Sequence, residues 1–163
     1  MGLKKEVEAV LNKQVEQEFD AAVVYYGMYI YFEQELLKGF AAWFKHQMGE
    51  EMSHVAKLIE YMIERGGSPV VPATKAPRMK YASSLDALKS ALAHEHANTA
   101  GIHACLKVAA KADDPATLEM LQWFVKEQVE EEEHASDILN QIRIIGDIPG
   151  HLFYLDHHLA KRE

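Results

Sequence analysis

Cysteine is almost absent: Cys105 is the only one among 163 residues. A single thiol forms no internal disulfide, and no Cys-x-x-Cys metal motif is present. The chain has no apolar run near the roughly 20 residues that a membrane span needs. Its first residues also lack the apolar stretch of a signal peptide. These absences predict a cytoplasmic protein with no membrane partner.

Positive charge is also scarce. There are 17 lysines and arginines against 25 aspartates and glutamates, for a formal net charge of −8. Proteins that bind nucleic acid carry a basic patch, so we expect no nucleic-acid partner. An acidic chain instead suits the handling of cations. The length, with 48% hydrophobic and 26% charged residues, predicts a single domain over residues 1–163.

Proline is confined to a few places. Three of the five prolines lie within residues 68–83, and none precedes them. Because proline breaks helices, the proline-free stretches predict four long helices, with Pro115 opening the fourth. We place these helices at about 4–35, 39–65, 83–111 and 115–146. A short amphipathic helix is predicted at 151–161, after Pro149 and Gly150.

Connection lengths predict the topology. Short turns join the first helix to the second and the third to the fourth, so each pair is antiparallel. The linker of about 16 residues could extend to roughly 50 Å at ~3.3 Å per residue. A helix of about 27 residues is roughly 40 Å long. The linker can therefore run the length of the bundle, which predicts an all-α four-helix bundle with one long crossover.

Each predicted helix carries an apolar stripe at 3-and-4 spacing, and one carboxylate interrupts each stripe near its middle. An ionised carboxylate in a core costs several kcal/mol unless it is paired or bound to metal. No lysine or arginine lies on the stripes at mid-length. We therefore predict that these carboxylates bind cations. They are Glu18, Glu51, Glu95 and Glu131.

Histidine points to the kind of metal. Glu51 and His54 form Glu-x-x-His, which places both on one side of a helix. Imidazole together with hard oxygen ligands suits iron or manganese. On the fourth helix, Glu131 pairs at the same spacing with either His134 or Gln128, and the pattern leaves this register open.

Several segments resemble bacterial and archaeal non-haem ferritins. They are EEMSH at 50–54, AHEH at 93–96 and LQWFVKEQVEEEE at 121–133, with Glu18 and Tyr25 on the first helix. The resemblance covers nearly the whole chain. It implies a ferritin-like bundle with a short fifth C-terminal helix and a two-iron centre. Glu18, Glu51 and His54 would bind one iron, and Glu51, Glu95 and Glu131 the other, with Glu51 bridging.

The resemblance also assigns residues around this centre. It places Gln128 beside the metals and leaves His134 as a flanking residue. Tyr25, two turns after Glu18, could donate an electron or simply fill core. A third, transit metal position matches three further carboxylates, for which the alternative is a solvated acidic face. These are Glu50, Glu127 and Glu130.

The implied function is iron storage with ferroxidase activity, in which Glu51, His54 and Tyr25 are catalytic. Fe(II) would be oxidised by O₂ or H₂O₂ and stored as ferric oxyhydroxide inside a shell of 24 identical subunits. We expect the apolar side chains of the tail, Leu152, Phe153, Leu155 and Leu159, to pack against neighbouring subunits.

Two alternatives remain open. A bacterioferritin would hold haem on Met52. Such proteins supply a histidine ligand on the fourth helix where this chain has Glu131, so haem is not expected. A DNA-protecting miniferritin places its iron site between subunits and lacks the full ligand set within one bundle, and the acidic composition disfavours DNA.

Overall fold

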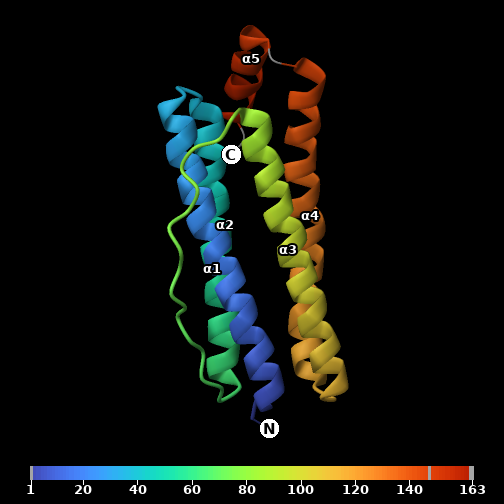
Figure 1. Ribbon diagram of the computed structural model, residues 1–163. Helices are drawn as coiled ribbons and strands as arrows, with labels where there is room; N and C mark the ends of the chain where they lie inside the picture. The colour runs from blue at the N-terminus through green and yellow to red at the C-terminus, as the bar shows by residue number, and fades with distance from the viewer. Residues whose placement is uncertain (1, 147, 162–163) are drawn as a thin grey trace.

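The computed structural model describes residues 2–146 and 148–161. Four long helices pack side by side: α1 (Lys5–Gln34), α2 (Lys38–Glu64), α3 (Ser84–Lys111) and α4 (Pro115–Ile145). A short helix, α5 (Pro149–Leu159), lies at one end of the bundle (Figure 1). The described ranges contain no strand, and none of their helices has the length and apolarity to cross a membrane. The predicted all-α bundle is confirmed.

The predicted crossover is also confirmed. The segment between α2 and α3 runs along the outside of the bundle beside α1, so α2 and α3 point the same way (Figure 1). The side chain of Asn12 anchors its start: its amide donates to the Ser68 carbonyl at 3.2 Å and its Oδ1 accepts from the Val70 N–H at 2.8 Å. Farther along, a Cβ on Gly27 would lie 3.0 Å from the Arg78 carbonyl oxygen, so glycine permits this close approach.

Local capping explains where the long helices end. At the end of α2, Gly67 N–H donates to the Met62 carbonyl at 2.8 Å and Gly66 N–H to the Ile63 carbonyl at 2.9 Å. Gly66 has a φ of 71°, the left-handed conformation that this Schellman motif needs. Ser83 caps α3 by accepting from the Asp86 N–H at 3.1 Å. The four long helices therefore begin and end within about one residue of the predicted positions.

The start of α5 differs from the prediction. Pro149 and Gly150 belong to its first turn, whereas the sequence suggested a break there. Proline fits a first turn because the N–H that it lacks would have no helical partner. Within α5, Leu155 and Leu159 are buried inside this chain, so their expected contact with neighbouring subunits is wrong. Phe153 is exposed, and Leu152 is partly buried.

Two apolar clusters form the core, one toward each end of the bundle. In the cluster near α5, the Phe32 ring stacks on two other rings. Its centroid lies 4.9 Å from that of Phe40 and 5.3 Å from that of Phe44. Leu58 and Phe124 belong to the other cluster. The buried carboxylates lie between the clusters along each helix. The apolar ends therefore stabilise a bundle whose middle layer is polar.

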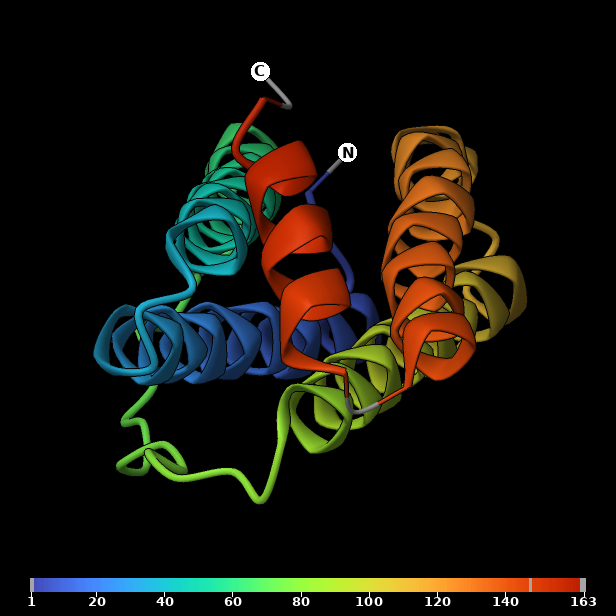
Figure 2. The same ribbon diagram turned by 90° about the horizontal axis from the view of Figure 1, so that it is seen from above.

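A contact from α5 completes the N-terminus of α2. Leu37, at the N-cap position, has no side-chain oxygen to accept from the first free N–H groups. Asp156 of α5 accepts instead from the Phe40 N–H at 2.9 Å and is itself buried. A Cβ on Gly39 would lie 1.7 Å from the Asp156 carbonyl oxygen, so only glycine lets α5 approach this closely. Seen from above, α5 lies between α2 and α4 (Figure 2).

We predict that Asp156→Ala loosens this end of the bundle. Loss of an N-cap acceptor costs about 1 kcal/mol, and the carboxylate also interacts favourably with the helix dipole. Hydrogen exchange should accelerate in the first turn of α2 and throughout α5. The exposed Asp137→Ala on α4 is the matched control. Unchanged exchange in Asp156→Ala would show that apolar packing alone holds α5.

Candidate metal centre

Five ligand-type side chains from four helices meet in the middle layer of the bundle. Glu18 and Glu51 are 0% exposed, Glu95 is 1% and Glu131 is 6% exposed, and His54 is 0% exposed. The predicted burial of the four carboxylates is therefore confirmed. Within residues 2–146 and 148–161, no lysine or arginine forms an ion pair with any of them. Their role as metal ligands stays a prediction.

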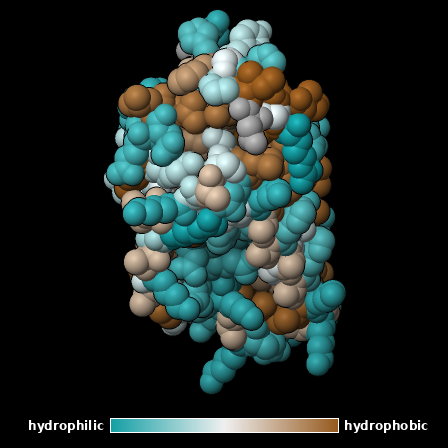
Figure 3. All heavy atoms as spheres, turned by 45° about the horizontal axis from the view of Figure 1, so that its top comes forward, coloured by the Kyte–Doolittle hydropathy of each residue, from teal (hydrophilic) through white to brown (hydrophobic). Residues whose placement is uncertain are grey.

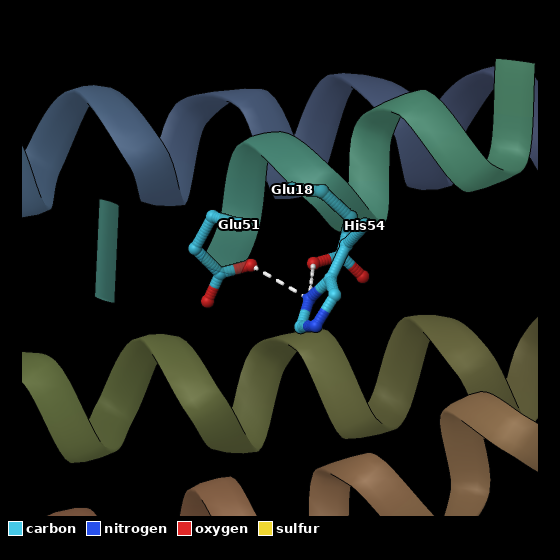
Figure 4. Close-up of side chains that lie close together, drawn as sticks. All are labelled: Glu18, Glu51 and His54. Atoms are coloured by element: carbon cyan, nitrogen blue, oxygen red, sulfur yellow. Dashed lines mark hydrogen bonds and ion pairs between the residues drawn. The ribbon is translucent and has the colours of Figure 1, made fainter. Parts of the chain in front are cut away.

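The tightest group joins α1 and α2 (Figure 4). His54 Nδ1 lies 3.4 Å from Glu18 Oε2 and 3.2 Å from Glu51 Oε2. One ligand atom from each of the three residues lies within 4.8 Å of the others. Among the described residues, Glu51 Oε1 and His54 Nε2 are buried without a hydrogen-bond partner. Such orphaned atoms cost about 1–3 kcal/mol each, and a cation would satisfy them.

Protonation compensates for charge in this group when no metal is bound. Burial lowers the pKa of His54, but hydrogen bonds and charge from Glu18 and Glu51 raise it to about 11. Burial also disfavours ionisation of Glu18, yet its hydrogen bond with His54 brings its pKa below the ordinary value. Burial and the nearby charge of Glu18 hold the pKa of Glu51 well above its usual range. A bound cation would replace these protons and release them.

Glu95 and Glu131 extend the centre onto α3 and α4. Glu95 accepts hydrogen bonds from the Tyr25 hydroxyl and from Gln128 Nε2, the latter at 3.3 Å. Burial raises the pKa of Glu95. Burial and the charge of Glu95 raise the pKa of Glu131 to about 7, although Gln47 donates a hydrogen bond to it. These two carboxylates therefore hold protons more readily than free glutamates do.

Tyr25 lies where the apolar core meets the centre. Its ring packs against Phe44 in the apolar cluster near α5, with centroids 5.8 Å apart. Its hydroxyl contacts the carboxylate of Glu95. Burial and the charge of Glu95 raise the phenol pKa well above its usual value. Tyr25 is therefore a neutral hydrogen-bond donor next to the centre, and its electron-donating role stays a prediction.

A second close group lies beside the first. Glu50, Glu127 and His54 offer ligand atoms within 4.8 Å of one another, and His54 Nε2 is 3.9 Å from Glu127 Oε1. His54 thus belongs to both groups. Glu130, the third residue of the predicted transit position, is exposed and lies outside this group, and its role stays a prediction.

On α4, the sequence left open whether His134 or Gln128 accompanies Glu131 at the centre. His134 is half-buried and lies in neither of the two close groups of described residues. Gln128 is 2% exposed, and its amide donates to the backbone carbonyl of Glu95 and to Thr99, each at 3.2 Å. The structure therefore brings Gln128 beside the centre. Whether it binds metal directly stays a prediction.

Two glutamines beside the centre were not predicted from the sequence. Gln14 Nε2 donates to Glu18 Oε1 at 2.6 Å, and Gln47 donates to Glu131. Both are nearly fully buried. A signal was present in the sequence, because positions 7, 11, 14 and 18 continue one stripe at 3-and-4 spacing. A glutamine on such a stripe needs a polar partner inside the core.

Known proteins that are similar to this chain in sequence are ferritins. Residues 8–145 match a family described as Ferritin-like domain. The chain is 35% identical over 160 residues to a bacterial non-heme ferritin of Staphylococcus epidermidis, covering 98% of this chain and 96% of that protein. It is 32% identical to a bacterial non-heme ferritin of Bacteroides fragilis, covering 98% and 99%.

Solved structures of ferritins have the same fold as this chain. An open pore ferritin from the hyperthermophilic archaeon Archaeoglobus fulgidus superposes with a TM-score of 0.97 at 36% identity, covering 99% of this chain and 100% of that one. An engineered closed form of the Archaeoglobus fulgidus ferritin gives 0.96 at 36% identity, covering 99% of each chain.

The raised pKa of Glu131 predicts a stability change that depends on pH. Between its ordinary value of 4.5 and about 7, folded Glu131 keeps a proton that the unfolded chain releases. Its contribution to stability is therefore present below pH 4.5 and is lost as pH rises to about 7. The rise in pKa from 4.5 to about 7 corresponds to a loss of about 3 kcal/mol in the free energy of unfolding over this pH range.

Glu131→Gln should remove this pH-dependent loss while leaving an acceptor for Gln47. In metal-free protein with a chelator, the variant should match the parent at pH 4 and be more stable at pH 8. Thermal unfolding at both values measures the difference. A difference between variant and parent that does not change with pH would contradict a buried, protonated Glu131.

Proposed function

Since this chain belongs to the ferritin family, we propose that it is an iron storage protein that oxidises Fe(II) at the centre between its four long helices. One observation carries the proposal. Four buried carboxylates and a buried histidine converge, and within the described residues no lysine or arginine pairs with them. Such a layer is costly in an empty core and favourable once divalent cations bind.

Two Fe(II) ions are the substrate in this proposal. Glu18, Glu51 and His54 hold the first ion, and Glu51, Glu95 and Glu131 hold the second. Glu51 bridges them, which is supported by its two oxygens: Oε2 faces His54 at 3.2 Å, whereas the buried Oε1 has no partner among the described residues. Binding displaces the protons of His54 and of the carboxylates with raised pKa values.

Oxidation then takes one electron from each iron. Two Fe(II) and one H₂O₂ with two protons give two Fe(III) and two waters, whereas O₂ accepts the same two electrons and two protons to form H₂O₂. Anionic oxygen ligands favour the higher charge of Fe(III), so the carboxylates stabilise the product. The hydrogen bond from the Tyr25 hydroxyl to Glu95 supports the proposed electron-donating role of this residue, in which Tyr25 replaces one of the two irons as the source of an electron for the oxidant.

The group of Glu50, His54 and Glu127 lies directly beside the proposed iron centre. We propose that Glu50, Glu127 and Glu130 form a transit position through which iron passes before it is stored as ferric oxyhydroxide. Support comes from His54, whose Nδ1 faces the first group and whose Nε2 faces Glu127 at 3.9 Å. The two nitrogens of one imidazole thus face both groups, which supports a path for iron between them.

Assembly into a cytoplasmic shell of 24 subunits is part of the proposal. Apolar side chains gather toward the α5 end of the molecule (Figure 3). Exposed fractions there are 84% for Ile144, 52% for Ile148, 56% for Phe153 and 77% for Tyr154. Exposed apolar patches mark contact sites between proteins, which supports packing of this end against other copies of the chain.

The two alternatives have less support. Met52 is 41% exposed on α2 and available in principle as a haem ligand, but the curated relatives reported above are non-heme ferritins. A DNA-protecting miniferritin would share its metal site between subunits. Here one chain supplies all five side chains of the centre.

We predict that Glu51→Ala and His54→Ala each slow iron oxidation by about 100-fold or more, because metal sites lose up to that factor even when only a supporting residue is removed. Assembly should be unaffected. The exposed Glu60→Ala on α2 is the matched control. If either ligand variant kept the full rate, the assignment of that residue would be wrong.

The assay adds aerobic Fe(II) to metal-free protein and follows near-ultraviolet absorbance, with size-exclusion chromatography of the same sample. We expect rapid oxidation of two irons per subunit in a particle close to 24 subunits. No acceleration over buffer would overturn the proposed ferroxidase function. A small particle with normal rates would overturn only the shell.

A further inference from the structure

One oxygen of Glu18 is held by a side chain outside the ligand set. Gln14 lies one turn earlier on α1, is 1% exposed and donates its amide Nε2 to Glu18 Oε1 at 2.6 Å. The other oxygen, Oε2, faces His54 at 3.4 Å. The two oxygens of Glu18 therefore have different surroundings. Oε1 accepts a hydrogen bond from the neutral amide of Gln14, whereas Oε2 faces His54, with which Glu18 forms the predicted metal site.

A glycine on another helix makes room for this amide. A Cβ on Gly101 of α3 would lie 2.0 Å from Gln14 Oε1 and 3.0 Å from its Cδ, far inside contact distance. Glycine inside a helix is less favourable than alanine, because the unfolded chain has more conformational freedom at glycine. Gly101 lies within a regular helix and has no positive φ that would require glycine. An alanine at position 101 would therefore have to displace the buried Gln14 amide, and its Cβ would also lie 3.1 Å from Gln17 Oε1.

The chemistry of the amide suits this role. A lysine or arginine at position 14 would also bind Glu18, but its charge would compete with the incoming cation. A glutamine fixes the carboxylate while leaving its negative charge available. Supporting residues of this kind orient metal ligands, and their loss typically costs 10–100-fold in metal affinity or activity.

We propose that Gln14, which packs against Gly101, is a positioning residue. Its hydrogen bond fixes Glu18 Oε1, so that Oε2 is oriented toward the cation. The inference rests on the proposed function of the centre. It assigns Gln14 and Gly101 to the iron site although neither belongs to the proposed ligand set.

The test uses the full-length, assembled protein and Co(II), which binds without being oxidised. Calorimetry gives its affinity, and its ligand-field absorption reports the oxygen and nitrogen atoms around it. Gln14→Leu should bind Co(II) about 10–100-fold more weakly, with an altered spectrum. Initial rates of Fe(II) oxidation should fall by a similar factor. Gln122→Leu, at an exposed glutamine of α4, is the matched control.

Gly101→Ala tests the same contact without changing Gln14. The new methyl group should displace the amide and reproduce the loss of Co(II) affinity, although alanine favours the helix. Gly49→Ala is the matched control, because a Cβ there meets nothing within 4 Å. The double variant Gln14→Leu/Gly101→Ala should bind no more weakly than Gln14→Leu alone, since both changes remove one interaction.

The outcomes separate the two proposals. If the parent protein neither binds Co(II) nor oxidises Fe(II), the proposed function fails. If the parent does both and Gln14→Leu keeps its affinity and spectrum, the positioning role is overturned and the function stands. If Gln14→Leu does not assemble, the Co(II) affinity of Gly101→Ala tests the positioning role instead. An affinity equal to that of the parent would overturn the role. Additive losses in the double variant would likewise overturn the link between Gln14 and Gly101.

Discussion

Carboxylates buried at one level of a helical bundle repel one another and lose the hydration that they have in water. In this chain Glu18, Glu51, Glu95 and Glu131 share that level, and His54 is the one cationic partner that the described residues bring to them. Glu51 Oε1 and His54 Nε2 have no hydrogen-bond partner among the described residues, so the compensation there is incomplete. The middle of the bundle thus costs stability while no cation is bound, as expected of a site at which stability is traded for function.

The rest of the structure accommodates this polar layer. Apolar clusters on both sides bury aromatic and aliphatic side chains and keep the helices together. Apart from His54, the side chains that donate hydrogen bonds to Glu18, Glu95 and Glu131 are neutral: Gln14, Tyr25, Gln128 and Gln47. Neutral donors orient carboxylates without supplying the positive charge that metal would bring. The layer therefore stays receptive to cations and geometrically defined.

The end of the bundle at α5 depends on a different kind of contact. Asp156 reaches the free N–H groups of α2, and Gly39 removes the side chain that would block this approach. Docking buries Leu155 and Leu159 and leaves Phe153 and Tyr154 exposed. The same short helix thus closes one core cluster and presents an apolar surface outward.

The sequence by itself determined the helices and the buried carboxylates. Both depend on local rules: glycine, proline and capping residues set the helix ends, and the 3-and-4 spacing sets the inward face of each helix. Glu18, Glu51, Glu95 and Glu131 lie on those faces, so their burial could be predicted without knowing how the helices pack. The crossover followed from linker length.

Only the tertiary structure decided which inward side chains meet. Gln14 of α1 packs against Gly101 of α3, Gln47 reaches from α2 to Glu131 on α4, and His54 contacts Glu127 while Glu130 lies outside. These contacts depend on the relative rotation of neighbouring helices and on the rotamers that their packing allows. Periodicity along one helix identifies its buried face but holds no information about the partner across the core.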